Sequence, residues 1–312
     1  MTTEKGTGVR GTNMFERCCN SRSTINYEIV HNPQPIKLSS DMDNIIKNLL
    51  WYAPNIDSYQ ATKNELISDK VYDDFSFSYI LRKMGMVENR DVKWIEPNDP
   101  FDEPDWTFFE NSICTRCQKI IVTRQKNLSK TNDLLRCLRN CIAHGQFSVV
   151  DDYIIGFNKH TTKNNHKEEK KAVIKIKPEL LLSALRSLTS PMGKELLVAY
   201  AFEKAGYTVI QQPSATYHFD LFIEKAGKKY AIEIKDYRGQ AYLHPEHLER
   251  FLSRSEKLLP GVERVLFIDT SRVTKAVREK EMEIDNFRIV DLSQVKELLQ
   301  ENPVDILAQT EE

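Results

Sequence analysis

The pattern of apolar positions divides the chain into a first half of helical periodicity and a second half in which helices and strands alternate. Apolar residues recur near the helical period over residues 41–52, 72–86, 107–126 and 129–144. Asp41 is placed to cap the first of these helices, and Gly145 is placed to end the last. Residues 1–37 show no period and predict a flexible arm, and residues 91–106 predict a loop rich in Pro and Asp.

Two apolar runs, 148–158 and 170–178, predict a β-hairpin over 152–177, and a Leu-rich helix follows at 179–188. From residue 192 the pattern predicts a helix, three strands, a helix, a strand, a helix, a strand and a helix. We therefore expect a two-domain α+β protein. A helical domain with a β-hairpin occupies 38–188, an α/β domain with a central mixed sheet occupies 189–301, and a tail covers 302–312.

The composition narrows the class of protein. The chain has 312 residues, with 44 Lys and Arg against 45 Asp and Glu, and its formal net charge is -1. Residues 1–188 hold 27 basic and 24 acidic side chains, and the remainder hold 17 and 21. This balance predicts weak non-specific binding to nucleic acid. The composition excludes a disordered, collagen-like or disulfide-dense chain, and no apolar run suits a membrane helix or signal peptide, so we expect a cytoplasmic protein.

The segment 217–239, YHFDLFIEKAGKKYAIEIKDYRG, places three charged side chains in one predicted hairpin. If its turn is Ala226–Gly227, Asp220 lies opposite Glu233. Two carboxylates facing each other across strands repel, so the pair calls for a cation. Lys235 projects from the same face as Glu233, because side chains two residues apart in a strand share a face.

Two carboxylates and a lysine suit Mg²⁺, with Mn²⁺ as an alternative ion. Carboxylate oxygens hold such an ion while it keeps several waters, and the ion activates a bound water and polarises a phosphodiester. Lys235 can orient that water or stabilise the developing charge. Glu195, in the preceding predicted helix, is a further candidate ligand.

The string Asp220, twelve residues, Glu233-Ile234-Lys235, following a helical Glu195, resembles the PD-(D/E)XK restriction-endonuclease superfamily over residues 189–300. The resemblance implies that Asp220, Glu233 and Glu195 bind metal and that Lys235 is catalytic. Phe219 stands where the superfamily pattern has Pro. The competing interpretation is an exposed hairpin with solvated charges. Nearby residues that could touch nucleic acid, or simply be solvated, are Asp236, Tyr237, Arg238, His244 and His247.

A second motif ends the fourth predicted helix, where Arg139-Asn140 precedes His144-Gly145. A guanidinium and an imidazole about one and a half turns apart can bracket a phosphate, and RNA supplies its own 2′-hydroxyl nucleophile. The motif resembles the HEPN superfamily. This resemblance implies an all-helical bundle, a homodimer, and metal-independent RNA cleavage by Arg139, Asn140 and His144. The competing interpretation is a capped helix end.

Two further features leave alternatives open. Cys114 and Cys117 have the spacing of half a zinc site, but buried free thiols account better for them and for the pair Cys137 and Cys141. The hairpin tip, Lys159 to Lys171, could follow a nucleic-acid backbone or be a solvated loop.

The leading hypothesis is a prokaryotic defence nuclease that hydrolyses DNA with Mg²⁺ at the C-terminal site and dimerises, or cleaves RNA, through the N-terminal domain. A second hypothesis makes the HEPN-like site the effector of an RNase toxin, with the C-terminal domain as a nucleic-acid sensor. A third is a non-catalytic scaffold that binds nucleic acid. The sequence identifies no antitoxin or activator.

Overall fold

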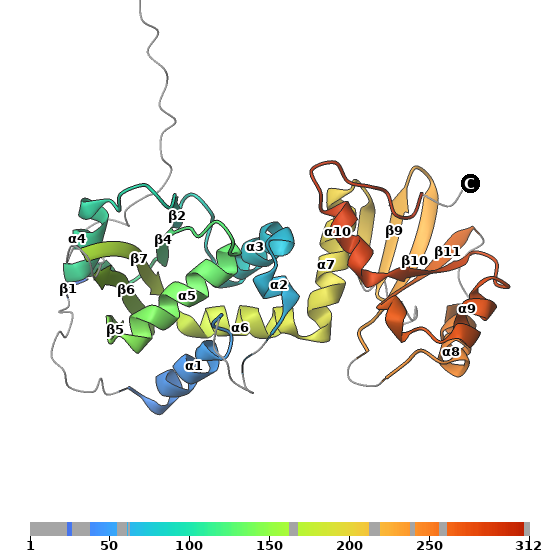
Figure 1. Ribbon diagram of the computed structural model, residues 1–312, viewed down its shortest axis with the longest axis horizontal. Helices are drawn as coiled ribbons and strands as arrows, with labels where there is room; N and C mark the ends of the chain where they lie inside the picture. Colours follow the sequence, from blue (N-terminus) through green and yellow to red (C-terminus); the bar gives the residue numbers. More distant parts are fainter. Residues whose placement is uncertain are drawn as a thin grey trace, which may run out of the picture. The chain divides into compact units, whose positions relative to one another are not determined.

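A computed structural model describes residues 24–26, 38–54, 61, 63–161, 168–211, 219–237, 241–255 and 261–308 (Figure 1). Most of the predicted arm, Arg238, the centre of the Lys-rich tip and the last residues of the tail lie outside these ranges. The chain divides into two compact units, Met1–Leu185 (unit 1) and Arg186–Glu312 (unit 2). Among the described helices, none is both long and apolar enough to cross a bilayer.

Unit 1 combines helices with a five-stranded sheet, so the predicted all-helical bundle is wrong. Its helices are α1 (Ser40–Leu50), α2 (Glu65–Ser68), η2 (Lys70–Tyr72), α3 (Asp73–Met84), α4 (Glu103–Asn111), α5 (Lys130–Ala143) and α6 (Pro178–Thr189). Its strands are β1 (Thr24–Asn26), β2 (Val92–Ile95), β3 (Ser112–Cys114), β4 (Lys119–Thr123), β5 (Phe147–Val150), β6 (Tyr153–Thr161) and β7 (Glu168–Ile176). The main sheet has the order β2-β4-β7-β6-β5, with only β2 and β4 parallel, and β1 pairs with β3 separately.

The predicted helix 107–126 is the largest error, because this range holds the end of α4 and the strands β3 and β4. Strand β4 lies inside the sheet, and all five of its residues are buried. A strand buried on both faces shows no polar alternation, and a short apolar run of this kind resembles a buried helix. Strand β2 likewise replaces part of the predicted loop 91–106.

Helices α5 and α4 cover opposite faces of the main sheet in unit 1. A side chain at Gly156 of β6 would meet Cys141 of α5 at 2.9 Å, so the helix lies directly on this glycine. On the other face, Trp106 of α4 packs its ring against Phe157, with ring centroids 5.1 Å apart. The hairpin of β6 and β7 confirms the predicted pairing, but a turn at Asp151–Asp152 makes β5 a separate strand.

Helix α1 starts one residue earlier than Asp41, and Ser39 is its cap. The Ser39 hydroxyl accepts a hydrogen bond from the Met42 amide at 3.2 Å. Asp41 lies in the first turn instead, where a negative charge suits the helix dipole.

Unit 2 has the predicted order of helices and strands. Its elements are α7 (Pro191–Lys204), β8 (Thr208–Gln211), β9 (Leu221–Lys225), β10 (Lys228–Lys235), α8 (Pro245–Ser255), β11 (Val262–Ile268), η3 (Thr270–Arg272), α9 (Lys275–Glu281), β12 (Phe287–Asp291), η4 (Leu292–Gln294) and α10 (Val295–Leu298). They build a mixed sheet of order β12-β11-β10-β9-β8, in which β10, β11 and β12 are parallel and β8 and β9 are antiparallel.

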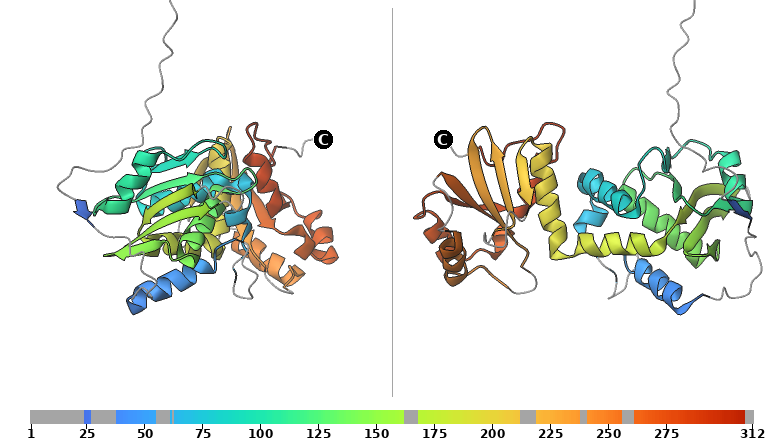
Figure 2. Two further views of the ribbon diagram at one scale, coloured as in Figure 1. Left: turned by 60° about the vertical axis from the view of Figure 1, so that its left-hand side comes forward. Right: turned by 180° about the vertical axis from the view of Figure 1, so that it is seen from behind.

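Helices lie on both faces of this sheet (Figure 2). On one face, Phe202 of α7 contacts the ring of Phe267 in β11, with centroids 5.9 Å apart. On the other face, Leu248 and Phe251 of α8 and Val277 of α9 form one buried cluster with Leu266. Strand β10 therefore lies between two helical layers, and its last residues emerge at the carboxyl end of the parallel strands.

Candidate active site in unit 2

The hairpin of β9 and β10 has the predicted register. Leu221 lies opposite Ile232, Lys225 lies opposite Lys228, and the turn is Ala226–Gly227. Both turn residues have positive φ, 50° and 79°, as a tight two-residue hairpin turn requires. The register fixes which side chains of β10 face each helical layer.

Asp220 leaves the regular ladder and uses its side chain to continue it. Its amide donates to the Ile232 carbonyl at 2.9 Å, and its Oδ2 accepts from the Ile234 amide at 2.7 Å. The carboxylate is thus fixed beside β10, immediately past Glu233. Burial raises the pKa of Asp220, while the Ile234 amide and the Lys235 charge oppose this effect.

Glu233 and Lys235 share one face of β10, as predicted, and they form an ion pair. The Glu233 side chain is 12% exposed, and that of Lys235 is 38% exposed. Ile232 and Ile234 are buried and alternate with them, which assigns them to the opposite face. The Lys235 ammonium thus compensates the charge of a nearly buried carboxylate.

Glu195 joins the group from helix α7. Burial raises the pKa of Glu195, the Asp220 charge raises it further, and the Lys235 charge lowers it. The charges of Asp220 and Lys235 thus both act on Glu195. Lys194, the preceding residue, donates to Asp236 Oδ1 at 2.9 Å and ties α7 to the end of β10.

A hollow of about 180 Å³ opens over Glu233 and Lys235. Helix α8 contributes His247 and Arg250 to its lining, and Tyr237 follows from the end of β10. His247 was one of several candidate contacts in the sequence, but Arg250 was not anticipated. The i,i+3 spacing of His247 and Arg250 was the available signal, since residues three apart share a helix face.

The donor chemistry of this group fits a hard divalent cation. Asp220, Glu233 and Glu195 offer carboxylate oxygens, and one oxygen of Asp220 is already occupied by the Ile234 amide. Within the described residues, however, no three acidic, His or Cys side chains are gathered closely enough to hold a metal by themselves. Mg²⁺ is often bound through one or two carboxylates, with waters and substrate oxygens completing its shell.

The Arg139 motif of unit 1 has a different environment. The Arg139 guanidinium donates to Asn140 Oδ1, at 2.8 Å from Nη2, and to the Pro54 carbonyl at 3.4 Å. His144 is exposed at the end of α5, where its amide donates to the Asn140 carbonyl and the Gly145 amide donates to the Ile142 carbonyl. These contacts are typical of a helix end. The Arg139 guanidinium forms its hydrogen bonds with groups of the protein itself, Asn140 Oδ1 and the Pro54 carbonyl.

The four described cysteines are free. Cys137 and Cys141 lie on the buried face of α5, and burial raises the pKa of both thiols. At the predicted half-zinc motif, the buried Lys175 ammonium donates to Cys117 Sγ at 3.2 Å and to the Cys114 carbonyl at 2.7 Å. A cationic side chain therefore lies against this Cys pair.

Comparison with known proteins bears on unit 2. Residues 188–299 match the restriction endonuclease family Mrr_cat. No curated protein matches the chain in sequence. A repair endonuclease from Pyrococcus abyssi, known from its crystal structure, is 13% identical over 58% of this chain and 75% of its own. Its TM-score of 0.22 is too low to support an argument. The family match covers the whole hairpin and both flanking helices, so residues 188–299 are similar to a restriction endonuclease domain.

Proposed function

We propose that unit 2 hydrolyses phosphodiester bonds of DNA with a divalent cation, Mg²⁺ or Mn²⁺, at Asp220, Glu233 and Lys235. The carrying observation is the convergence of these three side chains at the end of β10, within the part of the chain that matches a restriction endonuclease family. DNA is proposed because restriction endonucleases act on it.

Each residue has a separate role in this proposal. Asp220 and Glu233 hold the cation, and Glu195 completes or orients its water shell. The bound cation would supply an activated water and polarise the phosphodiester. Lys235, which forms an ion pair with Glu233, would donate a hydrogen bond to the attacking water or to the developing phosphorane oxygen. His247 and Arg250, on the rim of the same hollow, bind neighbouring phosphates.

One cleavage panel tests the proposal. The full-length protein is offered duplex DNA, single-stranded DNA and RNA, each with Mg²⁺, with Mn²⁺ and with EDTA. We expect metal-dependent cleavage of DNA, and a loss of about 10²–10³-fold or more in Asp220→Asn, Glu233→Gln and Lys235→Ala, because each removes a group that acts on the reacting charge.

Matched controls lie in the same hairpin. Glu224→Gln on β9 and Lys229→Ala on β10 change the same residue types away from the end of β10, and they should cleave as the wild type does. Wild-type rates in Lys235→Ala, or equal cleavage in EDTA, would refute the proposal.

We do not extend the proposal to metal-independent RNA cleavage by unit 1. The all-helical bundle implied by the HEPN resemblance is replaced by a sheet, and the Arg139 guanidinium is engaged by Asn140 and Pro54. A homodimer and a role in defence stay predictions.

A further inference from the structure

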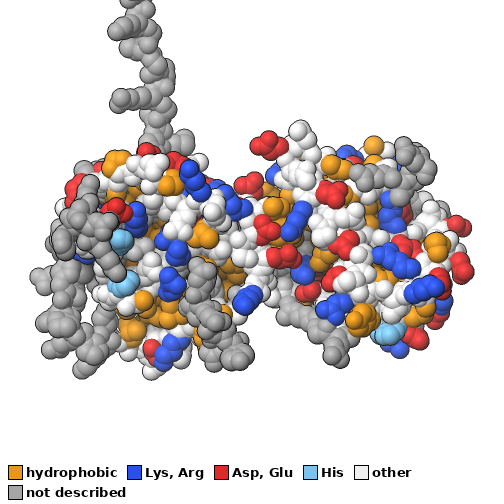
Figure 3. Space-filling model, in the orientation of Figure 1, with side chains coloured by type: hydrophobic (Ala, Val, Ile, Leu, Met, Phe, Trp, Pro, Cys, Tyr) orange, Lys and Arg blue, Asp and Glu red, His pale blue; other side chains and the backbone are white. Residues whose placement is uncertain are grey.

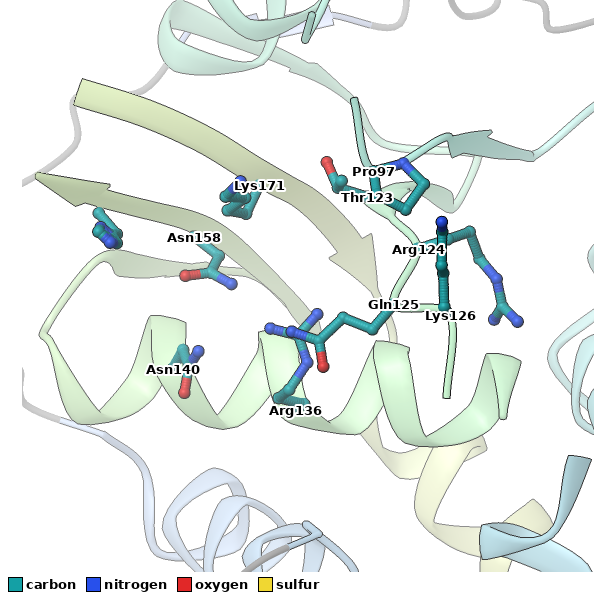
Figure 4. Close-up of a pocket in the computed structure, with 10 residues that line it drawn as sticks. Pro97, Thr123, Arg124, Gln125, Lys126, Arg136, Asn140, Asn158 and Lys171 are labelled. Atoms are coloured by element: carbon teal, nitrogen blue, oxygen red, sulfur yellow. The ribbon is translucent and has the colours of Figure 1, made fainter. Parts of the chain in front are cut away.

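Unit 1 contains a second hollow, of about 420 Å³, that is separate from the candidate nuclease site. Figure 4 shows it between helix α5, strands β6 and β7, and the segment that follows β4. Five basic side chains line it, and no carboxylate belongs to the described residues of its lining. These side chains are Arg124, Lys126, Arg136, His160 and Lys171.

The two arginines are positioned by one buried acid behind the lining. Asp133 of α5 has no exposed side-chain surface, and it pairs with Arg124 at 2.9 Å and with Arg136 at 3.4 Å. Burial raises the pKa of Asp133, while the neighbouring amide and both guanidinium groups oppose this effect. The acid also accepts from the Gln125 amide at 3.2 Å, so it fixes the segment after β4 against the helix.

This arrangement leaves donors available to a ligand. The Nε of Arg136 is buried and has no hydrogen-bond partner within the described part of the chain. Lys126 is exposed and forms no ion pair with any described residue. Lys171 pairs with Glu169 at 2.9 Å, and that acid is outside the lining. A buried donor without a partner costs free energy, which a bound acceptor would recover.

The types of side chain in the lining indicate that phosphate groups, rather than a base, are recognised. Asn140 and Asn158 line the hollow from α5 and β6, both on the same side of Arg136 (Figure 4). They add amide groups to the cations, whereas Phe, Tyr and Trp are missing from the described lining. Arg and amide donors suit phosphate oxygens, and stacking on a base needs an aromatic ring.

We propose that this basic pocket binds the phosphate groups of a small phosphorylated ligand. Its volume is within the range of small-molecule sites, about 300–1,000 Å³, and its cations converge from four segments on one hollow. Arg136 binds one phosphate group from the side of α5, Lys126 and Lys171 bind phosphate oxygens at the rim, and Arg124, which pairs with Asp133 and Asp73 and donates to the Leu128 carbonyl, adds positive charge behind the lining. The site is independent of the proposed nuclease activity, because all of its residues belong to unit 1.

Calorimetric titration of the full-length protein tests this site. The probes are pyrophosphate, AMP, ADP and adenosine, in EDTA and at about 0.1 M salt, where exposed charges are partly screened. We expect ADP and pyrophosphate to bind with dissociation constants below about 1 mM, and adenosine, which lacks phosphate, not to bind. The double variant Lys126→Gln/Lys171→Gln should weaken ADP binding by about tenfold or more, because two charge-assisted contacts are lost.

Two controls separate binding at this pocket from binding elsewhere on the chain. Lys47→Gln/Lys83→Gln removes two exposed charges from helices α1 and α3 of the same unit, and it should bind ADP as the wild type does. Asp220→Asn should also bind ADP normally, so a failure of the nuclease proposal leaves this result intact. Thermal unfolding of the pocket variant reports whether its fold is retained.

Several results would overturn the proposal. Adenosine binding as tightly as ADP would show that the base is recognised rather than the phosphate. Undiminished ADP binding in the folded pocket variant would place the ligand elsewhere. If a short oligonucleotide without terminal phosphate bound in a manner sensitive to the pocket variant while no mononucleotide bound, the hollow would belong to a nucleic-acid path instead.

Discussion

Individual carboxylates in unit 2 are held by backbone amides that the sequence does not reveal. Asp220 was predicted from its spacing to Glu233 and Lys235, and the structure adds the Ile234 amide that fixes its orientation. A carboxylate that accepts a backbone amide has one oxygen committed and one free. Asp220 can therefore continue the strand pairing with one oxygen and offer the other to the proposed cation.

Asp291 is likewise held by backbone amides, here in a structural role. Its hydrogen bonds predict a contribution to stability that is lost in acid. Burial would raise its pKa, but hydrogen bonds from Ser293 and Thr270 lower it to about 2. The carboxylate accepts from the amides of Thr270 at 2.9 Å and Ser293 at 2.8 Å. Because the folded-state pKa is depressed, this stabilisation is present above the ordinary value of 3.8 and is lost as pH falls towards about 2.

We therefore expect Asp291→Ala to lower the free energy of unfolding by about 1–2 kcal/mol near neutral pH, as for other lost caps. Urea unfolding over a pH series would show the difference from wild type shrinking as the solution is acidified through that window. Asp285→Ala, in an exposed turn before β12, serves as the control. A difference that did not change with pH would contradict the assigned hydrogen bonds.

At the scale of elements, one glycine sets how helix α7 begins. An added Cβ at Gly193 would lie 2.0 Å from the Leu188 carbonyl oxygen, which is part of the backbone and cannot move aside alone. Glu195 is two residues further along the same helix. The first turn of α7 therefore depends on close packing against the end of α6.

We expect Gly193→Ala to destabilise unit 2 by about 1–3 kcal/mol, the usual cost of overpacking, and to reduce DNA cleavage by displacing Glu195. Thermal unfolding and cleavage rates measure the two effects. Met192→Ala alters the exposed neighbouring residue and should change neither quantity. Wild-type stability in Gly193→Ala would show that α7 is free to shift.

For the whole molecule, the division into two units predicts that cleavage belongs to unit 2 alone. Although the division falls at residue 186, helix α6 runs from Pro178 to Thr189, and Gly193 packs against its last turn. A fragment of residues 178–312 keeps that helix intact. We expect it to fold, as a compact unit with its own core can, and to retain metal-dependent cleavage of DNA within about tenfold of the full chain.

The fragment carrying Lys235→Ala is the matched control and should be inactive. Circular dichroism establishes folding before activity is compared. A folded fragment without cleavage, beside an active full-length protein, would show that unit 1 supplies part of the site.

The net charge of the whole molecule differs from the local charge at each candidate site. Unit 2 carries the excess of acidic residues, and its acidic and basic side chains are intermixed on the face drawn in Figure 3. The basic side chains that could attract phosphate are instead concentrated locally, at Lys235 and Arg250 in unit 2 and around Arg136 in unit 1. A neutral average therefore does not describe either site.

The sequence by itself determined the order of elements in unit 2, the hairpin register and the common face of Glu233 and Lys235. Each follows from a local rule: the period of apolar residues, the two-residue turn at Ala226–Gly227, and the alternation of side chains along a strand. Such rules act over a few residues, and a single sequence contains them in full.

Only the tertiary structure decided the sheet of unit 1, the Asp220 contact with Ile234, and the basic pocket. Strand β4 is buried on both faces, which erases the alternation that would have identified it. Arg124, Arg136 and Lys171 are separated in sequence and meet because β7 lies beside β4 under α5. The folded arrangement of distant segments, through burial and pairing, creates such sites, and no local pattern encodes it.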